Sequence, residues 1–158
     1  MPNRTTRRLF LKTSIAASTL GVALGAGLLS PRTVMAAWPA EAFKARKTQQ
    51  ALQALMGNES TSPSESITIK APDIAENGAV VPVTIDTSIN GAESIALIAS
   101  NNATPLVASF NLGKGAQGYV STRIKMGKTG DVVAVVKSGG KLFSARKGVK
   151  VTIGGCGG

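Results

Sequence analysis

The chain has 158 residues, a length typical of one domain, and carries a formal charge of +10 with no histidine and a single cysteine. The absence of histidine removes the commonest general base, the commonest metal ligand and the usual haem ligand. A single cysteine excludes a disulfide within the chain and a metal site built from thiolates alone. Because only 4% of the residues are aromatic and the basic residues form no long run, the charge does not indicate nucleic-acid binding.

The first 36 residues have the features of an export signal. A twin-arginine motif and its flanking residues stand at the spacing read by the twin-arginine pathway: Arg7, Arg8, Phe10 and Lys12. An apolar stretch over residues 13–30 follows, and small residues at 34–37 fit a cleavage site. Hydroxyl side chains interrupt the apolar stretch, so a cleaved leader fits better than a transmembrane anchor. We therefore predict a signal peptide over residues 1–36, export to the periplasm, and no membrane attachment after cleavage.

Residues 37–66 are predicted to form an N-terminal helix and a linker. Alanine and charged helix formers follow Pro39, and the helical pattern runs to Met56 before Gly57. The segment from 58 to 66 is polar and contains Pro63, which is typical of a linker.

Residues 67–153 show the two-residue alternation of strands with one buried face. The positions that alternate on the expected buried face are Val81, Val83 and Ile85; Leu106, Ala108, Phe110 and Leu112; Val120, Thr122, Ile124 and Met126; and Val149, Val151 and Ile153. The valine-rich run over 132–136 is predicted to be a central strand. Seven or eight short strands at this spacing predict an all-β fold, an immunoglobulin-like antiparallel β-sandwich.

Turn residues separate these strands. Three pairs supply the positive φ angles of two-residue hairpin loops: Asn77-Gly78, Asn90-Gly91 and Gly139-Gly140. Because proline cannot donate to a ladder, Pro82 predicts an edge strand or a bulge at that position. Gly148 is expected to bend or break the last strand.

The last five residues are Gly154, Gly155, Cys156, Gly157 and Gly158. Glycines on both sides of the cysteine predict a flexible arm that exposes the thiol about 10 Å beyond the sandwich. Catalysis in place needs rigidly held groups, and no neighbouring base activates the sulfur, so no catalytic residue is assigned. With an ordinary pKa near 8.5, only a few per cent of such a thiol is thiolate at neutral pH. The pattern favours a sulfur to which a substrate is attached covalently while partner enzymes supply activation.

Four segments resemble the SoxY family of the thiosulfate-oxidising Sox system. They are the ending Val149–Gly158, the segment Ala71–Gly78 with Val80–Val83 after it, the later strand segment Thr122–Lys125, and the twin-arginine leader. The sequence Asn101-Asn102-Ala103-Thr104-Pro105 departs from the family's usual Asn-Pro-x-Pro. The first of those prolines is missing, so a less rigid loop is expected here.

The resemblance implies a division of labour between this chain and its partners. A SoxZ-like subunit is expected to form a heterodimer with the sandwich, and the haem cytochrome SoxAX to join thiosulfate oxidatively to Cys156. The manganese-dependent hydrolase SoxB would then release sulfate, and the sulfane dehydrogenase SoxCD would oxidise the sulfur that stays behind. Haem and manganese are therefore expected on the partners, and no cofactor on this chain.

Three other interpretations of Cys156 remain open on the residues alone. The chain could be an exported thiol redox protein that exchanges disulfides with an external thiol. It could be a structural subunit linked permanently as a Cys156–Cys156 homodimer. It could also be a periplasmic adhesion sandwich in which the cysteine is incidental. Each differs from a carrier in the adduct that it predicts on the sulfur.

Overall fold

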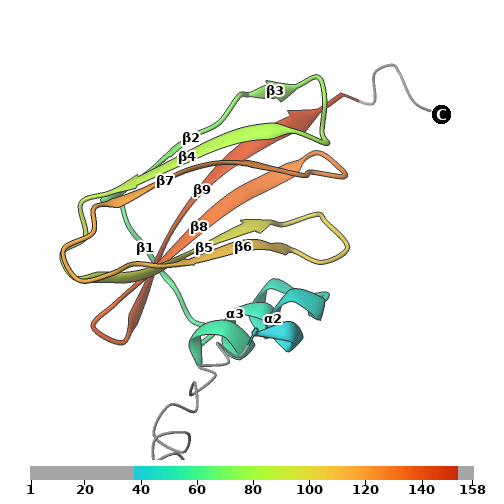
Figure 1. The fold of residues 1–158 in the computed structure, drawn as a ribbon. Coiled ribbons are helices and arrows are strands. Elements are labelled where there is room, and N and C mark those ends of the chain that lie inside the picture. Colours follow the sequence, from blue (N-terminus) through green and yellow to red (C-terminus); the bar gives the residue numbers. More distant parts are fainter. Residues whose placement is uncertain (1–37, 153–158) are drawn as a thin grey trace, which may run out of the picture. The chain divides into compact units, whose positions relative to one another are not determined.

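The computed structural model describes residues 38–152, which form two β-sheets packed face to face with two helices (Figure 1). The first sheet has the strand order β1-β9-β8-β5-β6, with β3 also paired to β9, and the second has the order β2-β4-β7. The strands of the first sheet are β1 (Ser62–Pro63), β3 (Ile74–Ala75), β5 (Ala92–Ala99), β6 (Leu106–Asn111), β8 (Gly130–Ser138) and β9 (Lys141–Val151). The strands of the second are β2 (Ile67–Lys70), β4 (Val81–Thr87) and β7 (Gly118–Ile124). This confirms the predicted sandwich class, with β8 in the middle of the first sheet as expected.

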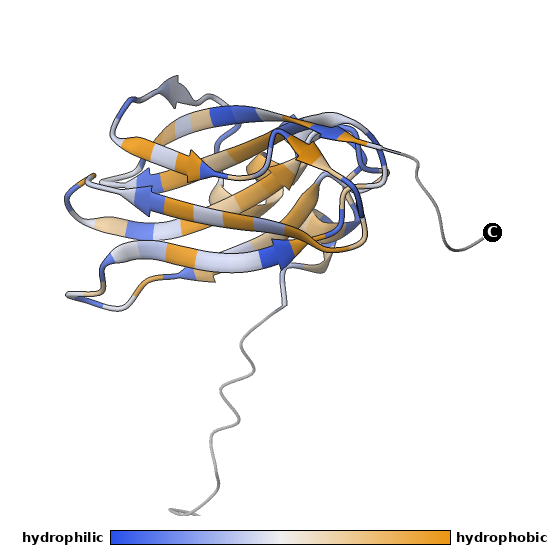
Figure 2. Cartoon of the chain, turned by 90° about the horizontal axis from the view of Figure 1, so that it is seen from above, coloured by the Kyte–Doolittle hydropathy of each residue, from blue (hydrophilic) through white to orange (hydrophobic). Residues whose placement is uncertain are grey.

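The apolar core between the sheets follows from the alternation in the sequence. Along β4 every second residue is buried, from Val81 to Thr87, and the residues between them are exposed or partly exposed. The same alternation places Val120 and Ile124 of β7 in the core. Figure 2 shows the alternation as orange and blue bands along the strands. Burial of one face of each strand is therefore the main force that holds the two sheets together.

A second apolar core lies between the first sheet and the helices α2 (Ala40–Lys44) and α3 (Thr48–Met56). The prediction of a single helix was wrong, because the structure has two. The chain leaves the helical conformation at Ala45 and resumes it at Thr48. In one continuous helix Ala42 and Ala51 would lie about 180° apart around the axis. The break lets both become fully buried. The predicted end is confirmed at Gly57, which has a φ of 75° and caps α3.

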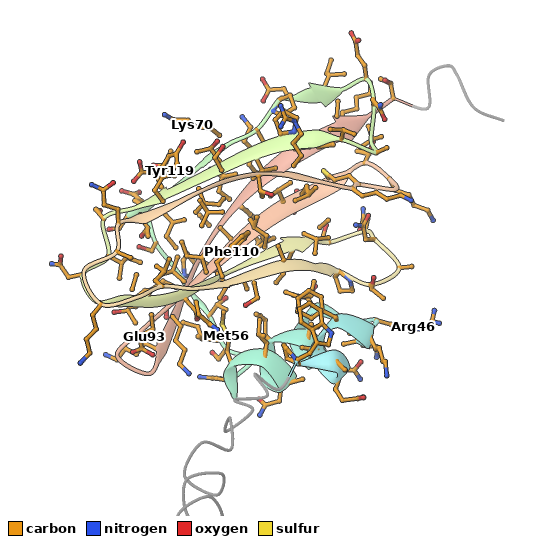
Figure 3. All side chains as sticks on the ribbon, in the orientation of Figure 1. Arg46, Met56, Lys70, Glu93, Phe110 and Tyr119 are labelled. Atoms are coloured by element: carbon orange, nitrogen blue, oxygen red, sulfur yellow. The ribbon has the colours of Figure 1, made fainter. Side chains whose placement is uncertain are left out.

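Strand β5 was not predicted, because its sequence does not alternate. Ile95 and Leu97 face the other sheet, whereas Ala96 and Ile98 face the helices. All four are fully buried. A strand that is covered on both faces has no polar face. Its sequence is therefore a continuous apolar segment without the two-residue alternation. In Figure 3, Phe110 lies in the layer between the sheets and Met56 in the layer between α3 and the first sheet.

A bulge in β6 changes the face that its first residue occupies. Leu97 pairs with Ala108 and Ile98 with Leu106, which leaves Val107 without a partner across the strands. One extra residue reverses the side-chain direction on one side of it. Leu106 consequently packs with the helices, and the prediction that it shares a face with Ala108 and Phe110 was wrong.

Of the three predicted hairpin turns, only Gly139-Gly140 forms one. Both residues have positive φ angles, 55° and 75°, and join β8 to β9. Asn90-Gly91 instead lies in the crossing from β4 in the second sheet to β5 in the first. Gly78 precedes β4 and has no positive φ. A turn dipeptide thus predicts that the chain changes direction, but it does not predict whether the two strands that flank it pair with each other.

The predictions for Pro82 and Gly148 had different outcomes. β4 is the middle strand of its sheet, but its pairing with β2 ends at Thr84, so Pro82 is paired only with Arg123 of β7. The local position is therefore that of an edge, as a proline requires. Gly148 was expected to bend or break the strand, but it pairs in register with Asp131 inside β9, so the strand does not break there.

Candidate functional site

The last described residues of β9 lead directly to the predicted arm. We call Lys150, Val151 and Thr152 the arm root. Cys156 and its four glycines lie outside the described residues, as do the four residues of the export motif. The C-terminal end of β9 is the described element to which the predicted arm is attached (Figure 1).

One edge of the arm root is bonded to β3. The backbone N–H of Lys150 donates to the carbonyl of Asp73 at 2.9 Å, and that of Thr152 donates to the carbonyl of Ala75 at 3.1 Å. The Lys147 ammonium lies 2.9 Å from the Asp73 carboxylate, which adds an ion pair between a partly buried lysine and an exposed aspartate beside the strand. This parallel pairing continues the sheet past Val149, the last residue of β9 that pairs with β8.

The other edge of the arm root contacts the β7–β8 loop. The Thr129 hydroxyl accepts a hydrogen bond from the Val151 N–H at 2.9 Å and donates one to the Val151 carbonyl at 3.2 Å. Beside this contact, the backbone N–H of Met126 donates to the Gly78 carbonyl at 2.7 Å. Three separate segments therefore meet at the end of β9.

The β5–β6 loop reinforces this end of the sandwich. The Asn102 side chain donates to the Lys125 carbonyl at 2.7 Å and accepts from the Gly127 N–H at 2.8 Å. The Asn101 amide donates to the Thr129 carbonyl at 2.7 Å. Two asparagine side chains thus tie the loop to its neighbour, so the loop that lacks the family's first proline is held by side-chain hydrogen bonds.

Gly78 is the tightest packing point beneath the arm root. A Cβ at this residue would overlap the Met126 carbonyl oxygen and lie 2.7 Å from Cγ1 of Val151. We expect Gly78→Ala to lower the free energy of unfolding by about 1–3 kcal/mol, because backbone must shift to make room. Chemical denaturation measures this difference.

The matched control for that substitution is Gly127→Ala. Its added Cβ would lie 3.7 Å from Oδ1 of Asn102, an ordinary van der Waals contact. A change within about 0.5 kcal/mol is expected there. Equal losses in both variants would contradict close packing at Gly78.

The described residues contain neither a candidate metal site nor a helix that could span a membrane. Within residues 38–152 no three His, Cys, Asp or Glu side chains gather closely enough to bind a metal ion. The helices in that range are all too short and too polar to cross a membrane. What the structure contributes is the rigid end from which residues 153–158 continue.

Comparisons with known proteins agree on one family. A family model described as "Sulfur oxidation protein SoxY" matches residues 52–156. A solved structure of the sulfur carrier protein SoxY from Chlorobium limicola f thiosulfatophilum is 48% identical with a TM-score of 0.60, and the match covers 68% of this chain and 97% of that one. No curated protein matches the chain. With the family model matched over most of its residues and a solved relative matched over nearly its whole length, this chain belongs to the SoxY family.

Proposed function

We propose that this chain is a periplasmic sulfur carrier that holds thiosulfate-derived sulfur on Cys156 and presents it to partner Sox enzymes. The observation that carries the proposal is the position of the cysteine. Cys156 is the last residue of the stretch that matches the SoxY family model, and it follows the hydrogen-bonded arm root by only four positions. As a SoxY protein, the chain is a carrier and not a catalyst.

The loading step is an oxidation that the chain cannot perform alone. The thiol and thiosulfate join through a new sulfur–sulfur bond, giving Cys–S–S–SO₃⁻ with release of a proton and two electrons. A haem cytochrome of the SoxAX kind would accept the electrons. The energy and the activation both come from the partner, in keeping with a chain that has no histidine.

The unloading step returns sulfate and leaves one sulfur on the carrier. Water attacks the sulfonate sulfur of Cys–S–S–SO₃⁻, giving Cys–S–SH and hydrogen sulfate, so that no electrons are exchanged. A manganese-dependent hydrolase of the SoxB kind would carry out this reaction. SoxCD would then oxidise the remaining sulfane atom, and a SoxZ-like subunit would form the heterodimer with the sandwich.

Positive charge near the arm root supports anionic cargo. Lys125, Lys128 and Lys150 are exposed, and each is within one residue of a backbone contact that holds this end. Residues 37–158 carry thirteen basic and eight acidic side chains, a net charge of +5. Such a potential raises the rate at which anionic substrates and acidic surfaces are encountered.

The test is the mass of the C-terminal peptide. After exposure to thiosulfate and an oxidising cytochrome, trypsin cleaves after Lys150 and releases residues 151–158. We expect this peptide to gain the mass of S₂O₃ and to lose it on treatment with a reductant. The same peptide from Cys156→Ser is expected to stay unmodified.

Other masses would favour other functions. A glutathione adduct alone would indicate disulfide exchange, and a reducible dimer of the peptide would indicate permanent cross-linking. An unmodified thiol under every condition would rule out the carrier.

A further inference from the structure

The arm root continues beyond the strand that should support it. β8 begins at Gly130, which pairs with Val149, so no strand of the first sheet lies beside Val151 on that edge. β3 supplies only two residues on the opposite edge. A strand end held on one edge by so short a partner would fray.

The Thr129 hydroxyl occupies the place of the missing strand. A neighbouring antiparallel strand would offer one residue a carbonyl to accept its N–H and an N–H to donate to its carbonyl. One hydroxyl group performs both tasks for Val151, at 2.9 and 3.2 Å. The side chain therefore extends the ladder by one residue pair.

Thr129 is itself held in place by the β5–β6 loop. The Asn101 amide donates to the Thr129 carbonyl at 2.7 Å. A Cβ at Gly130 would lie 2.9 Å from the Asn101 amide nitrogen, so a side chain there would displace the Asn101 side chain from this position. The hydroxyl is thus fixed relative to the sandwich through a chain of contacts.

We propose that Thr129 is a positioning residue that sets the pivot of the arm at Thr152 instead of Val149. The proposal rests on the proposed function, because it concerns how the sulfur on Cys156 reaches a partner enzyme. Cys156 is four residues from Thr152 and seven from Val149. Moving the pivot adds about 10 Å of slack.

Slack lowers the local concentration of the sulfur at a docked enzyme. Effective concentration falls roughly as the −3/2 power of tether length once the span is reached. Lengthening the tether from four to seven residues therefore predicts a loss of about two- to threefold in kcat/KM for enzymatic loading. Reaction with a small reagent, which needs no docking, is unaffected by slack.

The structural half of the test compares amide hydrogen exchange in Thr129→Val and Thr129→Ser. Valine keeps the size of the side chain and removes the hydroxyl, whereas serine keeps the hydroxyl. We expect the Val151 amide to exchange about tenfold faster in Thr129→Val and to keep its wild-type rate in Thr129→Ser. An unchanged rate in Thr129→Val would overturn the proposal.

The functional half compares two reactions of Cys156 in the same proteins. Enzymatic loading by the cytochrome is expected to slow about two- to threefold in Thr129→Val and to recover in Thr129→Ser. Alkylation by iodoacetamide is expected to proceed equally in all three proteins. Faster exchange with unchanged enzymatic loading would overturn the positioning role.

The two proposals fail in different ways. If wild-type protein acquires no S₂O₃ adduct, the carrier function fails. The exchange rate of Val151 still decides whether Thr129 holds the arm root.

Discussion

Thiosulfate-dependent electron transfer through the reconstituted partner enzymes is expected to fall to the level without carrier when Cys156 is replaced by serine. An alcohol oxygen cannot form the sulfur–sulfur bond through which a sulfane atom is held. The chain has no other thiol to take over the cargo. Reduction of the terminal cytochrome, followed by absorbance, measures the effect.

The control for this prediction is the stability of the same variant. Serine differs from cysteine by one atom, and Cys156 follows the last residue of β9 by five positions. We expect the free energy of unfolding to stay within about 0.5 kcal/mol of the wild type. Substantial electron transfer by a folded Cys156→Ser protein would show that the sulfur travels by another route.

Leu97→Ala is expected to produce the largest loss of stability. Leu97 is fully buried in β5, with Ile95 and Val136 in the core between the sheets. Truncation removes apolar contacts and leaves a cavity, which costs about 2–5 kcal/mol in a well-packed core. Denaturation in guanidinium chloride measures the loss as a lower transition midpoint.

An exposed valine serves as the comparison for Leu97. Val80 is 50% exposed, and Val80→Ala is expected to change the free energy of unfolding by no more than about 0.5 kcal/mol. A cost below about 1 kcal/mol for Leu97→Ala would contradict tight packing between the sheets.

The alternation in the sequence predicted the sandwich because the outer face of the β2-β4-β7 sheet is exposed to solvent. Strands β4 and β7 have polar side chains between their buried ones, so their periodicity is visible along the chain. β5 is buried against both the second sheet and the helices, which removes the polar half of the pattern. The strand that was missed is therefore one that the fold covers on both sides.

The part of the site that consists of unusual residues in sequence could be predicted. The part that depends on contacts between distant residues could not. Cys156 and its flanking glycines are conspicuous in the sequence. Thr129 has no such signal, because a threonine in a Gly-Lys-Thr-Gly loop looks like an ordinary turn residue. Its role depends on its hydrogen bonds to Val151, twenty-two residues away.

The length of β9 determines how the protein responds to mechanical force. This strand pairs with β8 through nine residue pairs and with β1 and β3 on its other edge. A pull on the tail along the strand axis acts at right angles to the interstrand hydrogen bonds, which are perpendicular to antiparallel strands. Those bonds are loaded in shear and must break together, not one after another. A partner that pulls on the tail along this axis therefore meets high resistance before β9 separates from the sheet.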